Sequence, residues 1–123
     1  MVRRTLTREL RSMLVTVEKK DSTVDRLVGL IICSDGTQVL VSPKDYLYLR
    51  AFKWSMKRSF SRSYAGRWST KNGKRIFIFM HRVITRCPPD LVVHHIDNNQ
   101  LNNMRENLML LTPYEHKEYF SYR

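Results

Sequence analysis

The sequence is poor in cysteine, has no long hydrophobic run and contains no acidic side chain over residues 53–86. Its two cysteines, Cys33 and Cys87, fit no metal-ligand or redox spacing, so we expect free thiols in a reducing cytosol. The longest apolar run, residues 27–33, is far too short to span a membrane. Basic residues near the N-terminus precede no apolar segment, so no secretion signal is expected. These absences predict a cytoplasmic protein without a membrane partner.

The length and composition restrict the domain organisation. A chain of 123 residues is too short for a multidomain enzyme and holds at most one core plus a small satellite module. The hydrophobic fraction of 42% is enough for a packed core, which argues against a disordered basic tail as a description of the whole chain.

Positive charge is concentrated in one part of the sequence. The chain carries 22 Lys and Arg against 11 Asp and Glu, a formal net charge of +11. Nearly all of this excess lies in residues 53–86, whereas residues 87–123 carry more acidic than basic side chains. A charge concentrated in this way is typical of a phosphate-binding surface, although a solvated basic face is the alternative. The pattern therefore favours a nucleic acid as partner.

Turn and capping residues predict the elements of the first two thirds. Residues 34–36 indicate a hairpin turn between strands at 27–33 and 38–41. Ser42, Pro43 and Asp45 predict a helix over 43–51. Strands are expected at 53–57, 62–69 and 75–79, the last two joined by a turn at 71–74. One face of this sheet should pack on the helix and the other, rich in Arg and Lys, should lie on a duplex.

The C-terminal third follows a strand, loop, strand, helix pattern. A short helix over 80–84 is expected before a strand at 91–95, an Asn-rich loop at 97–103, a strand at 107–111 and a helix that begins at Thr112. The predicted fold class is α+β, a small antiparallel sheet with a helix followed by this C-terminal module. We divide the chain into an unassigned segment at 1–26, a basic sheet and helix region at 27–86, and a module at 87–123.

The four histidines all lie between positions 81 and 116. Because side chains alternate along a strand, the adjacent His94 and His95 should point to opposite faces and have different roles. His116, on the last helix, is placed to approach one of them. Two imidazoles that converge in this way form half of a divalent-metal site and leave positions open for water and a substrate oxygen.

The segment from 80 to 118 closely resembles the HNH endonucleases, above all residues 92–99, residues 102–108 and His116. It is most similar to the phage-encoded and homing type, whose nuclease module is a ββα-metal (His-Me finger) motif. The similarity extends upstream to residue 39. It implies a phage protein that acts in the host cytoplasm and hydrolyses phosphodiester bonds of double-stranded DNA, leaving a 5′-phosphate and a 3′-hydroxyl.

The resemblance also implies a role for each site residue. His95 would be the general base that takes a proton from the attacking water, and Asn107, opposite it on the second strand, would orient the imidazole. His94 and His116 would bind one divalent cation. Two imidazoles favour Zn²⁺, Ni²⁺, Co²⁺ or Mn²⁺, whereas many phage members have oxygen ligands suited to Mg²⁺ at these positions, so the identity of the metal stays open.

Most of the expected DNA contacts lie in the basic segment. Trp54 is expected in the core, Asp97 is expected to brace the Asn-rich loop, and the asparagines from Asn98 to Asn103 are expected to fix it. The expected DNA-binding residues are Lys53, Lys57, Arg58, Arg62, Tyr64, Arg67, Trp68, Lys71, Lys74, Arg75 and Arg82.

Two other functions fit part of the pattern. A DNA-binding module with an inactive HNH-like unit is the main alternative, and the presence of His95, Asn107 and both candidate ligands argues against it. An RNA-binding protein with a zinc-stabilised fold would need more metal ligands. We expect a monomer, which with one site would nick its substrate; double-strand cleavage would then require a dimer or two successive events.

Overall fold

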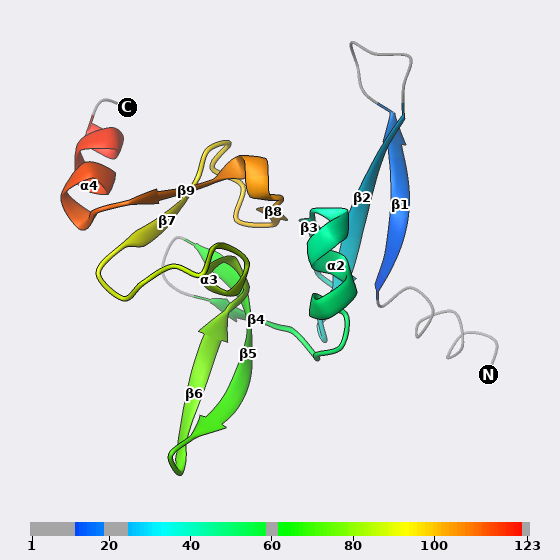
Figure 1. Ribbon diagram of the computed structural model, residues 1–123, viewed down its shortest axis with the longest axis horizontal. Helices are drawn as coiled ribbons and strands as arrows, with labels where there is room; N and C mark the ends of the chain where they lie inside the picture. The colour runs from blue at the N-terminus through cyan, green and yellow to red at the C-terminus, as the bar shows by residue number, and fades with distance from the viewer. Residues whose placement is uncertain (1–11, 19–24, 59–61, 122–123) are drawn as a thin grey trace.

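The computed structural model describes residues 12–18, 25–58 and 62–121 (Figure 1). Within these residues the chain forms several small sheets and short helices, a mixed α+β fold as predicted. In chain order the elements are β1 (Ser12–Glu18), β2 (Asp25–Ile32), β3 (Gln38–Val41), α2 (Pro43–Leu49), β4 (Ser55–Arg58), β5 (Ser63–Lys71), β6 (Lys74–Phe79), α3 (Met80–Thr85), β7 (Val92–His95), β8 (Asn102–Asn103), the 3₁₀ turn η1 (Arg105–Asn107), β9 (Leu108–Leu111) and α4 (Pro113–Ser121).

The first sheet has the strand order β1-β2-β3-β8. The predicted hairpin is confirmed, because β2 and β3 pair in antiparallel register and Gly36 has a φ of 91° in the turn between them. β1, in the segment left unassigned by the sequence, pairs antiparallel with β2. β8 joins β3 in parallel, with Leu40 opposite Asn102 and Val41 opposite Asn103. A loop of the C-terminal third is therefore part of the N-terminal sheet, across the boundary predicted at residues 86 and 87.

The core lies between this sheet, α2 and α3. Gly29 of β2 lets α2 approach closely, since a Cβ atom there would lie 2.7 Å from Val41 and 2.8 Å from Tyr46. Trp54 is buried as predicted, and its Nε1 donates to the carbonyl of Leu49 at 2.7 Å. The other buried members of the core cluster are Ile31, Cys33, Val39, Val41, Tyr46, Leu49, Ala65, Met80 and Ile84.

The second sheet, β4-β5-β6, contains a long β5–β6 hairpin that projects from the rest of the molecule (Figure 1). The predicted turn is confirmed by positive φ angles at Asn72 and Gly73. The expectation that one face would hold the basic side chains is wrong. Strand register divides them: Lys57 and Arg75 share a face with aromatic residues, whereas Arg58, Arg67, Lys71 and Lys74 lie on the face that contains the buried Ala65.

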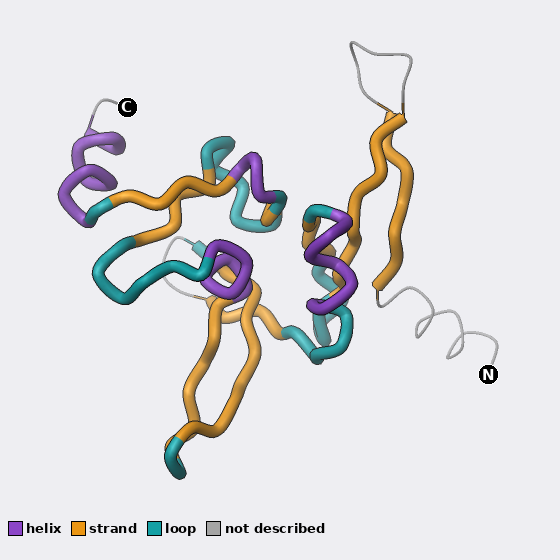
Figure 2. Tube along the Cα trace, in the orientation of Figure 1, coloured by secondary structure: helices purple, strands orange, loops and turns teal. Residues whose placement is uncertain are grey.

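The C-terminal third forms the predicted strand, loop, strand, helix arrangement. β7 and β9 pair antiparallel, and the loop between them carries β8 and η1 (Figure 2). α4 begins with the expected capping box, in which Thr112 Oγ1 accepts from the Glu115 amide at 3.1 Å and the Glu115 carboxylate accepts from the Thr112 amide at 2.8 Å. No described helix is long and apolar enough to cross a membrane. Both cysteines are free thiols, as predicted.

Candidate active site

His94 and His95 face different surroundings, as strand alternation predicts. Both are buried at the end of β7, with exposed fractions of 1% and 4%. The His94 ring faces His116 of α4, with ring centroids 5.6 Å apart and planes at 69°. The His95 ring lies instead near Tyr64 of β5 and His81 of α3, at centroid distances of 6.1 and 5.5 Å. Strand β7 thus presents His94 to His116 on one side and His95 to Tyr64 and His81 on the other.

His95 is held by a hydrogen bond from one of its two ring nitrogens. Its Nε2 lies 2.7 Å from Oδ1 of Asn103. With this amide orientation Nε2 carries the proton, so a neutral ring presents the lone pair of Nδ1. Burial lowers the pKa of His95 and the Arg62 charge adds to this, against the Asn103 bond and the Asp97 charge. The ring is therefore neutral at pH 7, the form that accepts a proton.

Asn107 does not lie where the sequence placed it. The residue opposite His95 on β9 is Leu108, and Asn107 ends the 3₁₀ turn before that strand. Its Nδ2 donates to Asp97 Oδ1 at 2.8 Å and to the Asn102 carbonyl at 2.9 Å, and its Oδ1 accepts from the Asp97 amide. Asn107 therefore closes the loop between β7 and β9, and the bond expected from it to His95 is formed by Asn103.

Asn103 is the site residue that the sequence did not single out. It is fully buried, because β8 pairs with β3 at this position. The only sequence signal for Asn103 was its place in an Asn-rich loop. Asp97 braces this loop as expected, because its carboxylate accepts from the Asn99 amide and from the Asn102 side chain. The pairing of β8 with β3, some sixty residues earlier in the chain, determines which asparagine hydrogen-bonds His95.

His81 and Arg82 are used inside the protein. His81 is 8% exposed and stacks on Phe79 with ring centroids 5.3 Å apart and planes at 4°. Burial, with smaller contributions from His95 and Arg82, lowers the pKa of His81 to about 3. The Arg82 guanidinium donates to the carbonyls of Leu91 at 2.9 Å and Pro88 at 3.3 Å. These bonds give Arg82 a role in fixing the segment before β7.

The His94 and His116 pair has the spacing of a shared metal. Two imidazoles bound at about 2.1 Å to one tetrahedral ion have ring centroids about 5 Å apart, close to the 5.6 Å found here. Within residues 12–18, 25–58 and 62–121, no group of three or more His, Cys, Asp or Glu could hold a metal ion. A cation bound here would have the imidazoles of His94 and His116 as its ligands from the described part of the chain.

Arg62 brings positive charge to both histidine environments. It lies just before β5, and its charge acts to lower the pKa of His95 and, second to burial, that of His116. A guanidinium whose charge acts on both His95 and His116 makes this part of the molecule suited to an anionic group.

A buried ion pair ties the active-site loop to the N-terminal helix. Arg105 of η1 donates from Nε and Nη2 to the Asp45 carboxylate at 2.9 and 2.7 Å, and its amide donates to Ser42 Oγ at 3.0 Å. Burial would raise the pKa of Asp45, but the bonds from Arg105 and Tyr48 outweigh it and the pKa is lowered. Ser42 is the N-cap of α2 and Pro43 begins the helix as predicted, but Ser42 Oγ forms no capping bond within α2, because Ser42 and Asp45 both accept from Arg105.

Comparison with family models gives a match to part of the chain. A family model described as HNH endonuclease matches residues 79–118, about a third of the chain, including β7, β9 and most of α4. Comparisons with curated proteins and with solved structures gave no match.

Proposed function

We propose that this chain, whose residues 79–118 match the HNH endonuclease family, is a metal-dependent nuclease that nicks or cuts double-stranded DNA and leaves a 5′-phosphate and a 3′-hydroxyl. The observation that carries the proposal is the arrangement on β7. A neutral, hydrogen-bonded His95 lies beside an imidazole pair with the spacing of a metal site. Together with η1, the elements β7, β9 and α4 supply the ββα-metal module of this family.

His95 acts as the general base. Its Nδ1 takes a proton from water as that water attacks phosphorus, and Asn103 holds the ring through Nε2 so that Nδ1 stays free of the proton beforehand. The lowered pKa keeps the base unprotonated at neutral pH. Asn107 acts on His95 indirectly, because its side chain hydrogen-bonds the loop that carries Asn103.

His94 and His116 hold one divalent cation, Mg²⁺, Mn²⁺, Zn²⁺, Ni²⁺ or Co²⁺, and their imidazole nitrogens favour the later members of this group. When bound, the metal supplies positive charge for the phosphate and the leaving oxygen. Arg62 adds positive charge from the protein that acts on both His95 and His116.

Basic residues around the β4-β5-β6 sheet hold the phosphate backbone. Arg82 is left out of this set because its guanidinium is bound within the chain. The chain acts as a monomer in the cytoplasm, in the manner of phage and homing nucleases. The residues proposed to bind the phosphate backbone are Lys53, Lys57, Arg58, Arg62, Arg67, Lys71, Lys74 and Arg75.

Plasmid cleavage tests the proposal directly. Supercoiled plasmid is incubated with the protein and each of the five divalent metals, and we expect open-circular or linear product that chelation with EDTA prevents. His95→Ala should reduce the rate by at least about 100-fold, the usual worth of a general base, while DNA affinity stays within about twofold. Leu47→Ala, at an exposed position of α2, serves as the control.

Two results would contradict the proposed nuclease function. Intact plasmid under every metal, with DNA binding retained, would favour the alternative function of a binding module with an inactive unit. Equal loss of cleavage and of DNA affinity in His95→Ala would show that this histidine has a structural role only.

A further inference from the structure

One face of the β4-β5-β6 sheet points away from the core and is aromatic. Strand register places Tyr64, Trp68, Phe77 and Phe79 on the same side, together with Lys57 and Arg75. The opposite side carries Ala65, which is buried in the core. We refer to these four aromatic residues and two cations as the aromatic face.

The rings of the aromatic face pack edge to face along the sheet. Trp68 contacts Phe77 with ring centroids 5.1 Å apart, Phe77 contacts Phe79 at 5.3 Å, and Phe79 contacts Tyr64 at 5.9 Å. Gly66 lies beneath them, and a Cβ atom there would come within 2.2 Å of the Phe77 ring. The absence of a side chain at position 66 thus lets the rings lie close to the strand.

Trp68 stands out because it is large, exposed and surrounded by positive charge. Its exposed fraction is 49%, against 2% for the core residue Trp54. The Arg75 guanidinium lies 4.5 Å from its ring centroid and the Lys57 ammonium lies 6.0 Å away. An exposed indole with two flanking cations matches a nucleotide, whose base stacks on a ring while its phosphate binds a cation.

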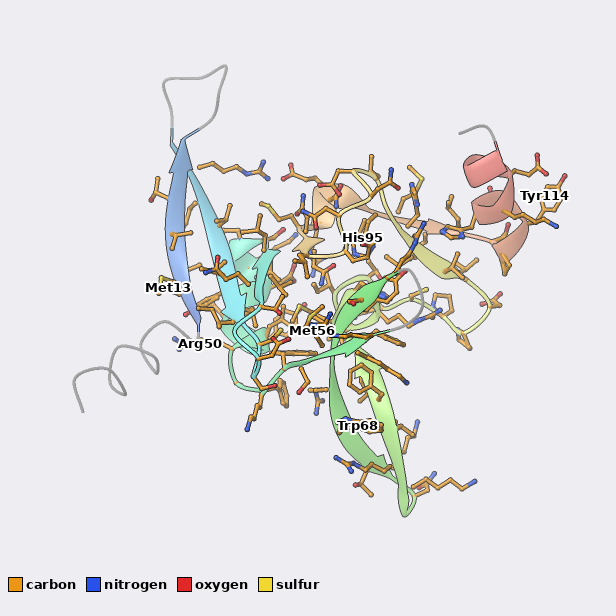
Figure 3. All side chains as sticks on the ribbon, turned by 180° about the vertical axis from the view of Figure 1, so that it is seen from behind. Met13, Arg50, Met56, Trp68, His95 and Tyr114 are labelled. Atoms are coloured by element: carbon orange, nitrogen blue, oxygen red, sulfur yellow. The ribbon has the colours of Figure 1, made fainter. Side chains whose placement is uncertain are left out.

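The other end of the aromatic face reaches the proposed base. Tyr64 lies 6.1 Å from the His95 ring, and Phe79 reaches it through His81. Figure 3 shows Trp68 along the projecting hairpin and His95 where this sheet approaches β7. A strand that follows the aromatic face from Trp68 therefore leads to the site of hydrolysis.

We propose that the aromatic face binds unpaired nucleotides of the substrate, so that the preferred substrate is duplex DNA with a single-stranded stretch next to the scissile bond. The bases of a continuous duplex are already stacked on one another, and phosphate contacts alone would need cations without exposed rings. This substrate class rests on the proposed nuclease function, but the binding surface does not.

Tryptophan fluorescence tests the surface without cleavage. The full-length His95→Ala protein is titrated with oligothymidylate of about 16 nucleotides, and separately with the duplex that it forms with oligoadenylate. We expect the single strand to quench emission from the exposed Trp68. Adding Trp68→Ala, with affinities then measured by fluorescence anisotropy of labelled DNA, should weaken single-strand affinity about tenfold, and by at least about fivefold more than duplex affinity. Ile76→Ala, at a 37% exposed position on the opposite side of the hairpin, should change neither affinity.

Cleavage then tests the substrate class. Wild-type protein should cut a duplex with a central mismatched bubble faster than the fully paired duplex, and Trp68→Ala should lose this preference. Absence of quenching, or equal loss of both affinities in Trp68→Ala, would overturn the aromatic face as a single-strand surface. Equal cutting of bubbled and paired duplex would overturn the substrate class. If quenching occurs and neither DNA is cut, the nuclease function and the substrate class with it are wrong, while the binding surface stands.

Discussion

At the scale of residues, Asn103 decides which nitrogen of His95 is available for proton transfer. A carbonyl oxygen 2.7 Å from Nε2 fixes the proton there, and the buried position leaves the amide little freedom to turn away. Asn103 is thus a positioning residue, since it acts on the substrate only through His95.

Asn103→Ala should lower kcat of DNA cleavage by at least about tenfold, since the imidazole loses its orientation and its tautomer preference. KM should change little, because Asn103 is fully buried and touches no DNA. The acid limb of the pH profile should also move, because the bond to Asn103 acts to raise the pKa of His95. Single-turnover kinetics across pH measure both effects.

Gln100→Ala provides the control in the same loop. It should leave the profile unchanged. If Asn103→Ala behaved like the control, or if it raised KM with an unchanged pH profile, Asn103 would not position the base.

The sequence predicts the local part of this site and misses the part that depends on distant strands. The alternation of His94 and His95, the capping box of α4 and the turn at Asn72 depend on neighbouring residues, and each is confirmed. The family resemblance implies Asn107 as the partner of His95, opposite it on the second strand. β9 begins one residue later, and the pairing of β8 with β3 selects Asn103 instead.

At the scale of elements, η1 is held by two ion pairs of unequal strength, one to α2 and one to β2. The Asp45 carboxylate is fully buried and its partner Arg105 is about half exposed. Arg26 of β2 binds Glu106 of the same turn, but both side chains are at least a third exposed. Water screens the exposed pair, whereas leaving the buried Asp45 carboxylate without a partner would cost free energy. The two pairs should therefore contribute differently to the free energy of unfolding.

Arg105→Ala should lower the free energy of unfolding by about 3 kcal/mol, because Asp45 keeps its burial and loses its charged partner. Arg26→Ala should lower it by less than about 1 kcal/mol. Urea denaturation at pH 7 measures both. Similar losses in the two variants would show that the pair with buried Asp45 does not hold η1 more strongly than the exposed pair with Arg26.

The sheet faces show a further limit of sequence reasoning at this scale. The strands β4, β5 and β6 were predicted within a few residues from their turns and composition. The composition of the segment does not predict which basic side chains share a face. That depends on strand register, which composition does not fix. The net charge of the segment predicts a polyanionic partner, and strand register adds that one face of the sheet combines aromatic rings with cations.

At the scale of the whole molecule, buried neutral histidines couple stability to pH. His81 has a folded-state pKa of about 3 and an ordinary value near 6.5 when unfolded. Between these values the unfolded chain binds a proton that the folded protein does not. The free energy of unfolding therefore has its full value above pH 6.5 and falls as the pH decreases toward 3.

The loss attributable to His81 should be on the order of 2 kcal/mol between pH 7.5 and pH 5. In His81→Phe, which keeps a ring beside Phe79 but does not titrate, the difference in unfolding free energy between the two pH values should shrink by that amount. Denaturant unfolding at both pH values measures the difference in each protein. An unchanged difference would mean that His81 is protonated in the folded state or that other groups dominate.

The parallel pairing of β3 with β8 also has a consequence for the order in which the protein becomes active. The two strands are separated by about sixty residues, so closing them costs chain entropy that local contacts do not repay. During synthesis strands β1, β2 and β3, helix α2 and the β5–β6 hairpin can all form before Asn103 leaves the ribosome. His95 acquires its hydrogen-bond partner only when the late loop docks on these strands, so the proposed nuclease activity would begin only after the body of the protein has folded.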